Sequence, residues 1–140
     1  MRTLVVEDDL TSGRVLQRFM TNYGPCEVAV TGTAALEAFR KSLEEKQRFD
    51  VVCLDIRLPE MDGQSVLKEI RRLESEQGIL GLEGTKVIMT TALSDSRNVI
   101  PAFRSQCDAY LVKPFDRRKL TQELQTLGLL KSVQPEQGLG

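Results

Sequence analysis

The stretch Val51-Val52-Cys53-Leu54-Asp55 decides the fold of this chain. Four consecutive apolar residues are typical of a strand that is covered on both faces of a parallel sheet, and Asp55 stands where that strand ends. Similar apolar runs precede three other polar groups, at residues 7–9, 91–92 and 113–115. Carboxyl ends of parallel strands share one edge of a sheet, so we expect all four groups to meet at the edge where such sheets bind ligands.

Outward from this run, short apolar strands alternate with amphipathic helices. The expected strands are residues 3–6, 27–30, 51–54, 86–90 and 109–112. The expected helices are residues 10–22, 33–45, a segment after residue 63, about 94–105, and 116–127. This alternation predicts an α/β fold with a five-stranded parallel sheet and five helices in a three-layer α/β/α sandwich. Right-handed crossovers with one reversal of winding give the flavodoxin-like strand order 2-1-3-4-5.

Length and composition limit the class of protein. The 140 residues fit one domain, which we place at residues 1–127, with residues 128–140 as a flexible tail or the start of a linker. A net charge of -1 argues against non-specific binding to nucleic acid or to anionic membranes. The short basic clusters Arg71-Arg72 and Arg117-Arg118-Lys119 are interpreted as solvated helix faces. Three cysteines without metal-ligand spacing, and no leader pattern or membrane-spanning run, predict a cytoplasmic protein without membrane insertion.

The acidic groups predict a cation site. In the order 2-1-3-4-5 the first and third strands are neighbours, which places Asp8 or Asp9 near Asp55. Two carboxylates about 5 Å apart repel by roughly 3 kcal/mol at an effective dielectric constant near 20. Oxygen ligands favour a hard divalent ion such as Mg²⁺ as the compensating charge. Solvated acids at a turn are the plainer interpretation of any one of these residues, but it weakens when three converge beside Lys113 and Thr91.

These pieces, in this order, resemble the receiver domain of two-component response regulators over about residues 2–127. The matching parts are the acidic residues 7–9, Asp55 with the loop 59–63, Thr91-Ala92, and Tyr110 ahead of Lys113-Pro114-Phe115. Each is weak alone, whereas all of them after the expected strands form a specific signal. The resemblance also implies the strand order given above.

The resemblance implies a role for each acidic position. Asp55 would accept a phosphoryl group from a phosphohistidine on a sensor histidine kinase. Asp8 and Asp9, with Asp55 and the backbone carbonyl of Arg57, would hold Mg²⁺, for which Mn²⁺ could substitute. The chain contains no histidine, so the donor must be another molecule.

Four further residues receive roles from the same resemblance. Lys113 would contact a phosphoryl oxygen, positioned by a cis peptide bond before Pro114. Thr91 would move toward the phosphoryl group, and Tyr110 would fill the space that it leaves. The surface of the fourth helix, fifth strand and fifth helix would then change and bind a downstream target protein. We therefore expect a switch, a monomer or a phosphorylation-dependent dimer, that binds no nucleic acid itself and turns over no separate substrate.

Two alternatives to this interpretation stay open, and three others are disfavoured by the sequence. Within the family, the chain could be a phosphorelay intermediate that passes phosphate to a histidine phosphotransfer protein, or the receiver part of a longer regulator. A degenerate receiver used only for docking is disfavoured because every acidic, hydroxyl and lysine position is filled. A flavin or nucleotide binder would need backbone amides where residues 7–9 are acidic. A phosphatase of the haloacid dehalogenase type would need an aspartate where Arg57 stands.

The chain departs from the family pattern at two places. Arg57 and Leu93 flank the expected phosphoryl group, and we expect them to crowd the path of attacking water and prolong the phosphorylated state. Pro101 should kink the fourth helix or delay its start, and Gln106 replaces the glycine that usually stops it. Pro101 and Gln106 lie on the surface expected to bind the downstream protein, and they leave the site around Asp55 unchanged.

Overall fold

The computed structural model describes residues 1–92 and 107–131. The expected fourth helix, together with Leu93, Pro101 and Gln106, therefore lies outside the described residues, as does the tail from residue 132. No described helix is long and apolar enough to cross a membrane.

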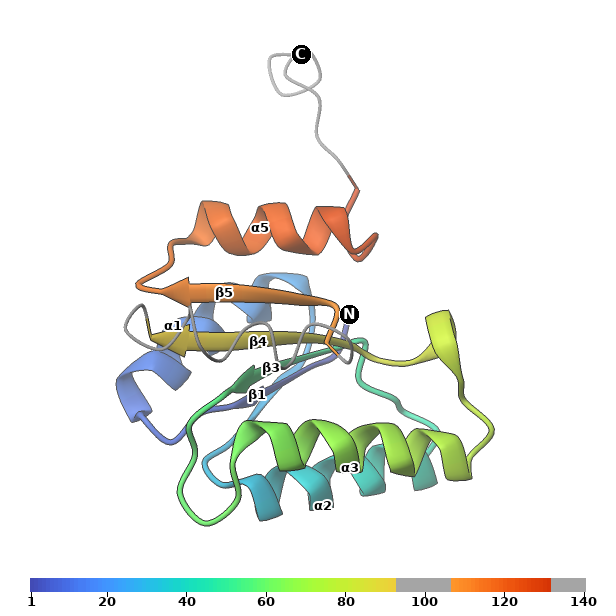
Figure 1. Ribbon diagram of the computed structural model, residues 1–140. Coiled ribbons are helices and arrows are strands. Elements are labelled where there is room, and N and C mark those ends of the chain that lie inside the picture. The colour runs from blue at the N-terminus through green and yellow to red at the C-terminus, as the bar shows by residue number, and fades with distance from the viewer. Residues whose placement is uncertain (93–106, 132–140) are drawn as a thin grey trace.

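One five-stranded parallel sheet forms the centre of the domain (Figure 1). Its strand order is β2-β1-β3-β4-β5, which confirms the predicted order. The strands are β1 (Thr3–Val6), β2 (Cys26–Ala29), β3 (Val51–Asp55), β4 (Lys86–Ala92) and β5 (Ala109–Lys113). The described α-helices are α1 (Leu10–Met20), α2 (Gly32–Glu44), α3 (Gly63–Glu76) and α5 (Arg117–Thr126), with short 3-10 helices η1 (Thr21–Tyr23) and η2 (Gly81–Glu83).

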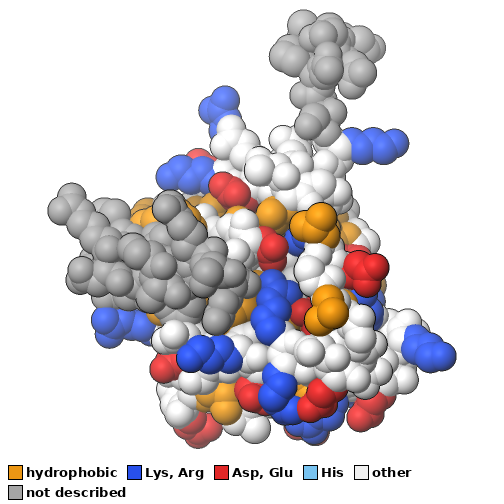
Figure 2. Space-filling view, turned by 45° about the vertical axis from the view of Figure 1, so that its right-hand side comes forward, with side chains coloured by type: hydrophobic (Ala, Val, Ile, Leu, Met, Phe, Trp, Pro, Cys, Tyr) orange, Lys and Arg blue, Asp and Glu red, His pale blue; other side chains and the backbone are white. Residues whose placement is uncertain are grey.

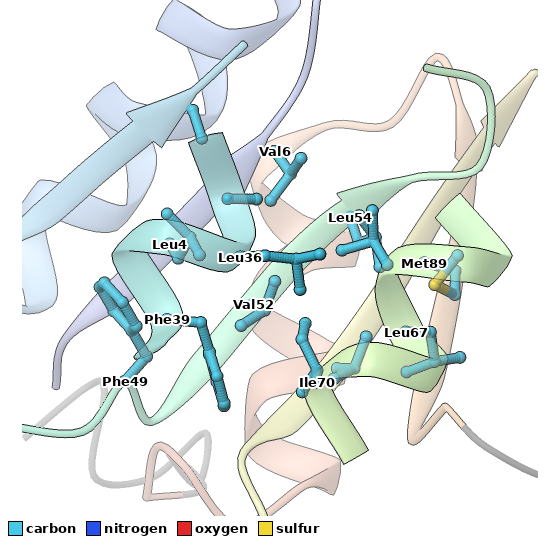
Figure 3. Packing of buried hydrophobic residues seen from close by; sticks show 14 of the residues in the cluster. Leu4, Val6, Leu36, Phe39, Phe49, Val52, Leu54, Leu67, Ile70 and Met89 are labelled. Atoms are coloured by element: carbon cyan, nitrogen blue, oxygen red, sulfur yellow. The ribbon is translucent and has the colours of Figure 1, made fainter. Parts of the chain in front are cut away.

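Alternate residues of the strands build two separate hydrophobic layers, because successive side chains of a strand point to opposite faces. Even-numbered β1 and β3 residues such as Val6 and Leu54 pack with α2 and α3, as Figure 3 shows. Odd-numbered residues such as Val5 and Cys53 pack with α1 and α5. The sheet is thus covered on both faces, which is why β3 reads as an unbroken apolar run.

The boundaries differ from expectation by one or two residues at several places. The first helix ends at Met20, and a 3-10 turn uses the residues that we had expected in its last turn. Val15 in this helix is 42% exposed. The fourth strand runs on to Ala92, so Thr91 belongs to the strand and is buried.

All four described α-helices begin with a side-chain cap. Asp9, Thr31, Asp62 and Asp116 each accept a hydrogen bond from a backbone N–H in the first turn of α1, α2, α3 and α5, respectively. Such a cap typically stabilises a helix by about 1 kcal/mol. Each helix follows the carboxyl end of a strand, so these caps fix the helix starts around the edge of the sheet that holds the polar groups.

Candidate functional site

Three carboxylates meet at the carboxyl edge of the sheet. One oxygen from each of Glu7, Asp8 and Asp55 lies within 4.8 Å of the other two. The register explains the meeting, because Val6 pairs with Leu54 and the next residues of the two strands are Glu7 and Asp55. Glu7 and Asp55 are buried, whereas Asp8 is exposed and leaves the cluster open to solvent.

Lys113 supplies a positive charge to this cluster from the end of β5. Its Nζ donates to Glu7 Oε1 at 2.5 Å and to Asp55 Oδ2 at 3.2 Å. The peptide bond between Lys113 and Pro114 is cis, the geometry that the family resemblance implied. Lys113, Glu7 and Asp55 therefore form one ion-pair group drawn from three strands.

The second oxygen of Glu7 has no hydrogen-bond partner in the described part of the chain. Glu7 Oε2 is buried without a hydrogen bond from any described residue, although the side chain is only 1% exposed. Burial raises the pKa of Glu7 to about 7, helped by the hydrogen bond and charge of Asp55 and opposed by Lys113. Burial alone would lower the pKa of Lys113, but the two carboxylates outweigh it and hold that pKa above its ordinary value. Among the described residues, the three carboxylates outnumber the one ammonium group, that of Lys113, which pairs with them.

A close backbone approach holds the loop after β3 beside Asp55. The backbone N–H of Arg57 donates to Asp55 Oδ1 at 3.0 Å, and that of Gly63 donates to the carbonyl of Ile56 at 2.8 Å. A Cβ atom at Gly63 would lie 2.5 Å from the carbonyl oxygen of Asp55. The start of α3 can therefore pack against the end of β3 only because residue 63 has no side chain.

The acidic pair differs from the predicted one by one residue. We had assigned Asp8 and Asp9 to the metal, but Asp9 lies outside the carboxylate cluster and caps α1. Its carboxylate accepts from Ser12 Oγ at 2.7 Å and from the Thr11 N–H at 3.3 Å. The Ser12 hydrogen bond is the main cause of a lowered Asp9 pKa. Among the described residues, the clustered carboxylates beside Asp55 are thus Glu7 and Asp8, whereas we had expected Asp8 and Asp9 there.

A pattern in the sequence could have revealed Glu7. Asp55 follows Cys53 by two residues, and Glu7 follows Val5 by two, so both carboxylates continue the layer that faces α1 and α5. Asp9, directly before the first apolar turn of a helix, has the typical position of an N-cap.

The remaining predicted residues lie on β4, on β5 and in the loop after β3. Thr91 is buried in β4, and its hydroxyl donates to the carbonyl of Ala92 at 3.3 Å. Tyr110 in β5 is 37% exposed. Arg57 is exposed beside the cluster, and the metal-binding role of its carbonyl stays a prediction.

A groove lies between α1 and the loop after β5, and Lys113 belongs both to its lining and to the ion-pair group. It has a volume of about 410 Å³ and is lined by Thr11, Ser12, Val15, Ala92, Lys113, Pro114 and Phe115. Lys113 therefore faces both the groove and the carboxylates.

The donor set fits a hard divalent cation. The available ligands are carboxylate oxygens, the type that Mg²⁺ and Mn²⁺ prefer, and Glu7 Oε2 is a buried oxygen that needs a positive partner. The exposure of Asp8 leaves room for the water ligands that Mg²⁺ usually retains.

Comparison with known proteins gives the same family from sequence and from structure. Residues 3–125 match the model of the response regulator receiver domain. The transcriptional regulatory protein ZraR of Escherichia coli (strain K12) is 33% identical over 123 residues, which are 87% of this chain and 25% of ZraR. The regulatory protein VanRB of Enterococcus faecalis is 35% identical over 127 residues, which are 91% of this chain and 52% of VanRB. The chain thus spans a quarter to a half of these relatives.

A solved receiver domain shares the fold and holds a metal. The receiver domain of the sensor histidine kinase PA1611 from Pseudomonas aeruginosa PAO1 has a magnesium ion coordinated in its active-site cleft. It is 28% identical, covers 91% of this chain and 97% of its own, and superposes with a TM-score of 0.70. With the matched family model, the shared strand order and the acidic cluster at the expected edge, this chain belongs to the receiver domain family of two-component response regulators.

Proposed function

We propose that this domain is a phosphorylation-controlled switch in which Asp55 accepts a phosphoryl group from a phosphohistidine on a sensor histidine kinase. The observation that supports this most is the meeting of three carboxylates with Lys113 Nζ at one solvent-accessible point. A carboxylate oxygen of Asp55 attacks the phosphorus, and the phosphorus–nitrogen bond of the donor breaks with its electron pair left on the imidazole. The product is an acyl phosphate on Asp55.

Glu7, Asp8 and Asp55 would hold Mg²⁺, or Mn²⁺ in its place, with the carbonyl of Arg57 as a further ligand. The ion would neutralise charge on the transferring group, where most of the catalysis of phosphoryl transfer lies. Lys113, already 3.2 Å from Asp55 Oδ2, would hold a phosphoryl oxygen on the opposite side. The backbone N–H of Arg57 fixes the other oxygen of Asp55 and so orients the nucleophile.

Phosphorylation adds charge and acceptor oxygens at Asp55. Thr91 and Tyr110 would respond to this charge and alter the face that includes β5 and α5, so that a downstream protein binds with changed affinity. The chain would catalyse only its own phosphorylation and dephosphorylation. A phosphorelay intermediate is the alternative, and the partial coverage of ZraR and VanRB supports the receiver part of a longer regulator equally.

Labelling with a small phosphodonor tests the proposal directly. Wild-type protein incubated with acetyl phosphate and Mg²⁺ should gain one phosphoryl group by intact-mass measurement, and chelation of the metal should abolish the gain. Asp55→Asn should gain none. Asp50→Asn, the same change at the residue directly before the opposite end of that strand, is the control and should be labelled like wild type. Labelling of Asp55→Asn at the wild-type rate would disprove the acceptor assignment.

A further inference from the structure

The loop after β3, residues 56–62, is held at both of its ends. At its start the Ile56 N–H donates to the Thr90 carbonyl at 3.0 Å, and just after its end the Gly63 N–H returns to the Ile56 carbonyl at 2.8 Å. Between these anchors Glu60 has a φ of 67°, in the left-handed region that residues other than glycine rarely adopt. Such a conformation persists only where the surrounding structure imposes it.

The start of α2 is in close contact with this loop. Helices α2 and α3 pack against each other on one face of the sheet (Figure 1). A Cβ atom at Gly32, the first residue of α2, would lie 2.8 Å from Val66 Cγ2, 3.1 Å from Met61 Cβ and 3.2 Å from the Met61 carbonyl oxygen. Residue 32 therefore has no room for a side chain, and the loop lies directly against the backbone of α2.

Resting on the proposed function, we propose that Gly32 is a positioning residue for phosphoryl transfer. Its contact with Met61 sets the place of the loop after β3, and with it the place of the Arg57 backbone beside Asp55. Gly32 itself touches neither the phosphodonor nor the metal, and it acts only through the loop.

The first support is what the loop carries. The Arg57 N–H donates to Asp55 Oδ1 at 3.0 Å and so orients the nucleophile. Four residues later the Met61 N–H donates to the Pro59 carbonyl at 2.7 Å, and the fixed φ of proline makes this turn stiff. A short loop that is held at both ends and stiff in the middle transmits a displacement at Met61 to Arg57. Misplacement of a reacting group by about 1 Å can slow a reaction about 100-fold.

The second support is that the loop, and not the helix, has to yield. Val66 in α3 is fully buried, so the packed core around it leaves no space for a shift of that helix. Leu58 and Met61 are only partly buried where they pack against the same core. An added methyl group at residue 32 would therefore push the loop outward.

Gly32→Ala adds that methyl group, and Gly13→Ala is its matched control. A Cβ atom at Gly13 in α1 has its nearest neighbour at 3.6 Å, an ordinary contact, and both changes replace a glycine by the best helix former. With acetyl phosphate and Mg²⁺, we expect labelling of Gly32→Ala to be at least about fivefold slower than that of wild type, whereas Gly13→Ala should stay within about twofold.

Nuclear magnetic resonance of metal-free protein gives a second readout, which loss of stability alone would not change. The Arg57 amide proton should move upfield in Gly32→Ala, because its hydrogen bond to Asp55 lengthens, and it should keep its position in Gly13→Ala. Either a wild-type labelling rate or an unchanged Arg57 resonance in folded Gly32→Ala would overturn the inference. Equal changes in Gly13→Ala would overturn it as well.

Met61→Ala tests the same contact if Gly32→Ala does not fold by circular dichroism. It removes the apolar anchor of the loop without adding an atom, and labelling should again be at least about fivefold slower. A wild-type rate in Met61→Ala would then overturn the inference. Absence of labelling in wild type would instead contradict the proposed function, which the Arg57 resonance does not depend on.

Discussion

Two glutamates lie almost fully buried at opposite edges of the same sheet, Glu7 at 1% and Glu74 at 2% exposure. Glu74 near the end of α3 has both oxygens bonded: Oε1 accepts from Arg71 at 2.8 Å, and Oε2 accepts from the Thr85 N–H at 2.6 Å, with Arg48 at 3.5 Å. Glu7 has one lysine and one oxygen without a partner among the described residues. The same side chain is thus satisfied at one edge and unsatisfied at the other.

The satisfied edge connects several segments of the chain. Arg71 also donates to the Thr85 carbonyl at 2.8 Å and to Asp108 Oδ2 at 3.0 Å, and that same oxygen accepts from the Val87 N–H at 2.8 Å. Figure 2, with this edge turned forward, shows acidic and basic side chains lying among one another. Arg48 Nε in this network is itself buried without a hydrogen-bond partner among the described residues, so the contrast between the two edges lies in the two carboxylates: both oxygens of Glu74 are paired, and one oxygen of Glu7 is not.

The largest effect should come from Glu74→Ala. This change removes the Glu74 carboxylate from Arg48 and from Arg71, which keeps Asp108, and leaves the Thr85 N–H buried without its acceptor. We expect the free energy of unfolding in urea to fall by about 3 kcal/mol, the cost of removing one partner from a buried ion pair. Mn²⁺ affinity at the other edge should stay within about twofold of wild type.

Glu69→Ala is the control for this change. Glu69 pairs with Arg72 on the same helix, but the pair is solvent-exposed and should contribute below about 1 kcal/mol. If the free energy of unfolding fell equally in Glu74→Ala and Glu69→Ala, the buried network around Glu74 would stabilise the fold no more than an exposed ion pair. The comparison of the two edges would then fail.

A smaller effect should appear as a pH dependence of stability in metal-free protein. Burial places the pKa of Glu7 at about 7 in the folded state, above the ordinary value of 4.5 that we take for the unfolded chain. Between these values the folded protein retains a proton that the unfolded chain has lost, so stability falls as pH rises. With Asp55, Asp8 and Lys113 facing Glu7, we expect a loss of about 2 kcal/mol from pH 5 to pH 8.

Glu7→Gln should flatten this slope, because glutamine cannot release the proton. Urea unfolding at several pH values in the presence of a chelator measures both proteins. The chain has no histidine, so the residue type that most often titrates in this window is missing. A slope that is unchanged in Glu7→Gln would show that another group causes it.

The apolar runs explain why much of this arrangement could be predicted from sequence. The run Val51-Val52-Cys53-Leu54 predicts a buried strand without information from the rest of the chain. Because the strands are parallel, their carboxyl ends share one edge of the sheet, and Asp55 and Lys113 meet there. The network around Glu74, at the amino ends of the strands, could not be predicted, and Arg71 was wrongly interpreted as part of a solvated helix face. Its partners Thr85 and Asp108 are 14 and 37 residues away, and no local pattern reports such contacts.

The acidic run at residues 7–9 shows a different limit of prediction from sequence. Three neighbouring carboxylates are chemically equivalent in sequence, and only the face on which each lies after β1 distinguishes them. Glu7 continues the buried layer, Asp8 is exposed, and Asp9 turns to the first N–H groups of α1. An acidic cluster at this edge was therefore predictable, while the choice of the residues that form it required the end of the strand to be placed to the residue.

The smallest expected effect on stability tests which of residues 7–9 belong to the carboxylate cluster. Asp9→Ala removes the acceptor of the Thr11 N–H and the Ser12 hydroxyl, and should lower the free energy of unfolding by about 1 kcal/mol, the usual cost of losing an N-cap. Because Asp9 is outside the carboxylate cluster, Mn²⁺ affinity should change by less than about threefold through the lost charge alone. Asp8→Ala, one residue earlier, should weaken Mn²⁺ binding by at least about tenfold with little loss of stability, because Asp8 is exposed and belongs to the cluster. If the two variants exchanged these outcomes, the metal would be held by Asp9 after all, and α1 would have to begin differently from the helix described here.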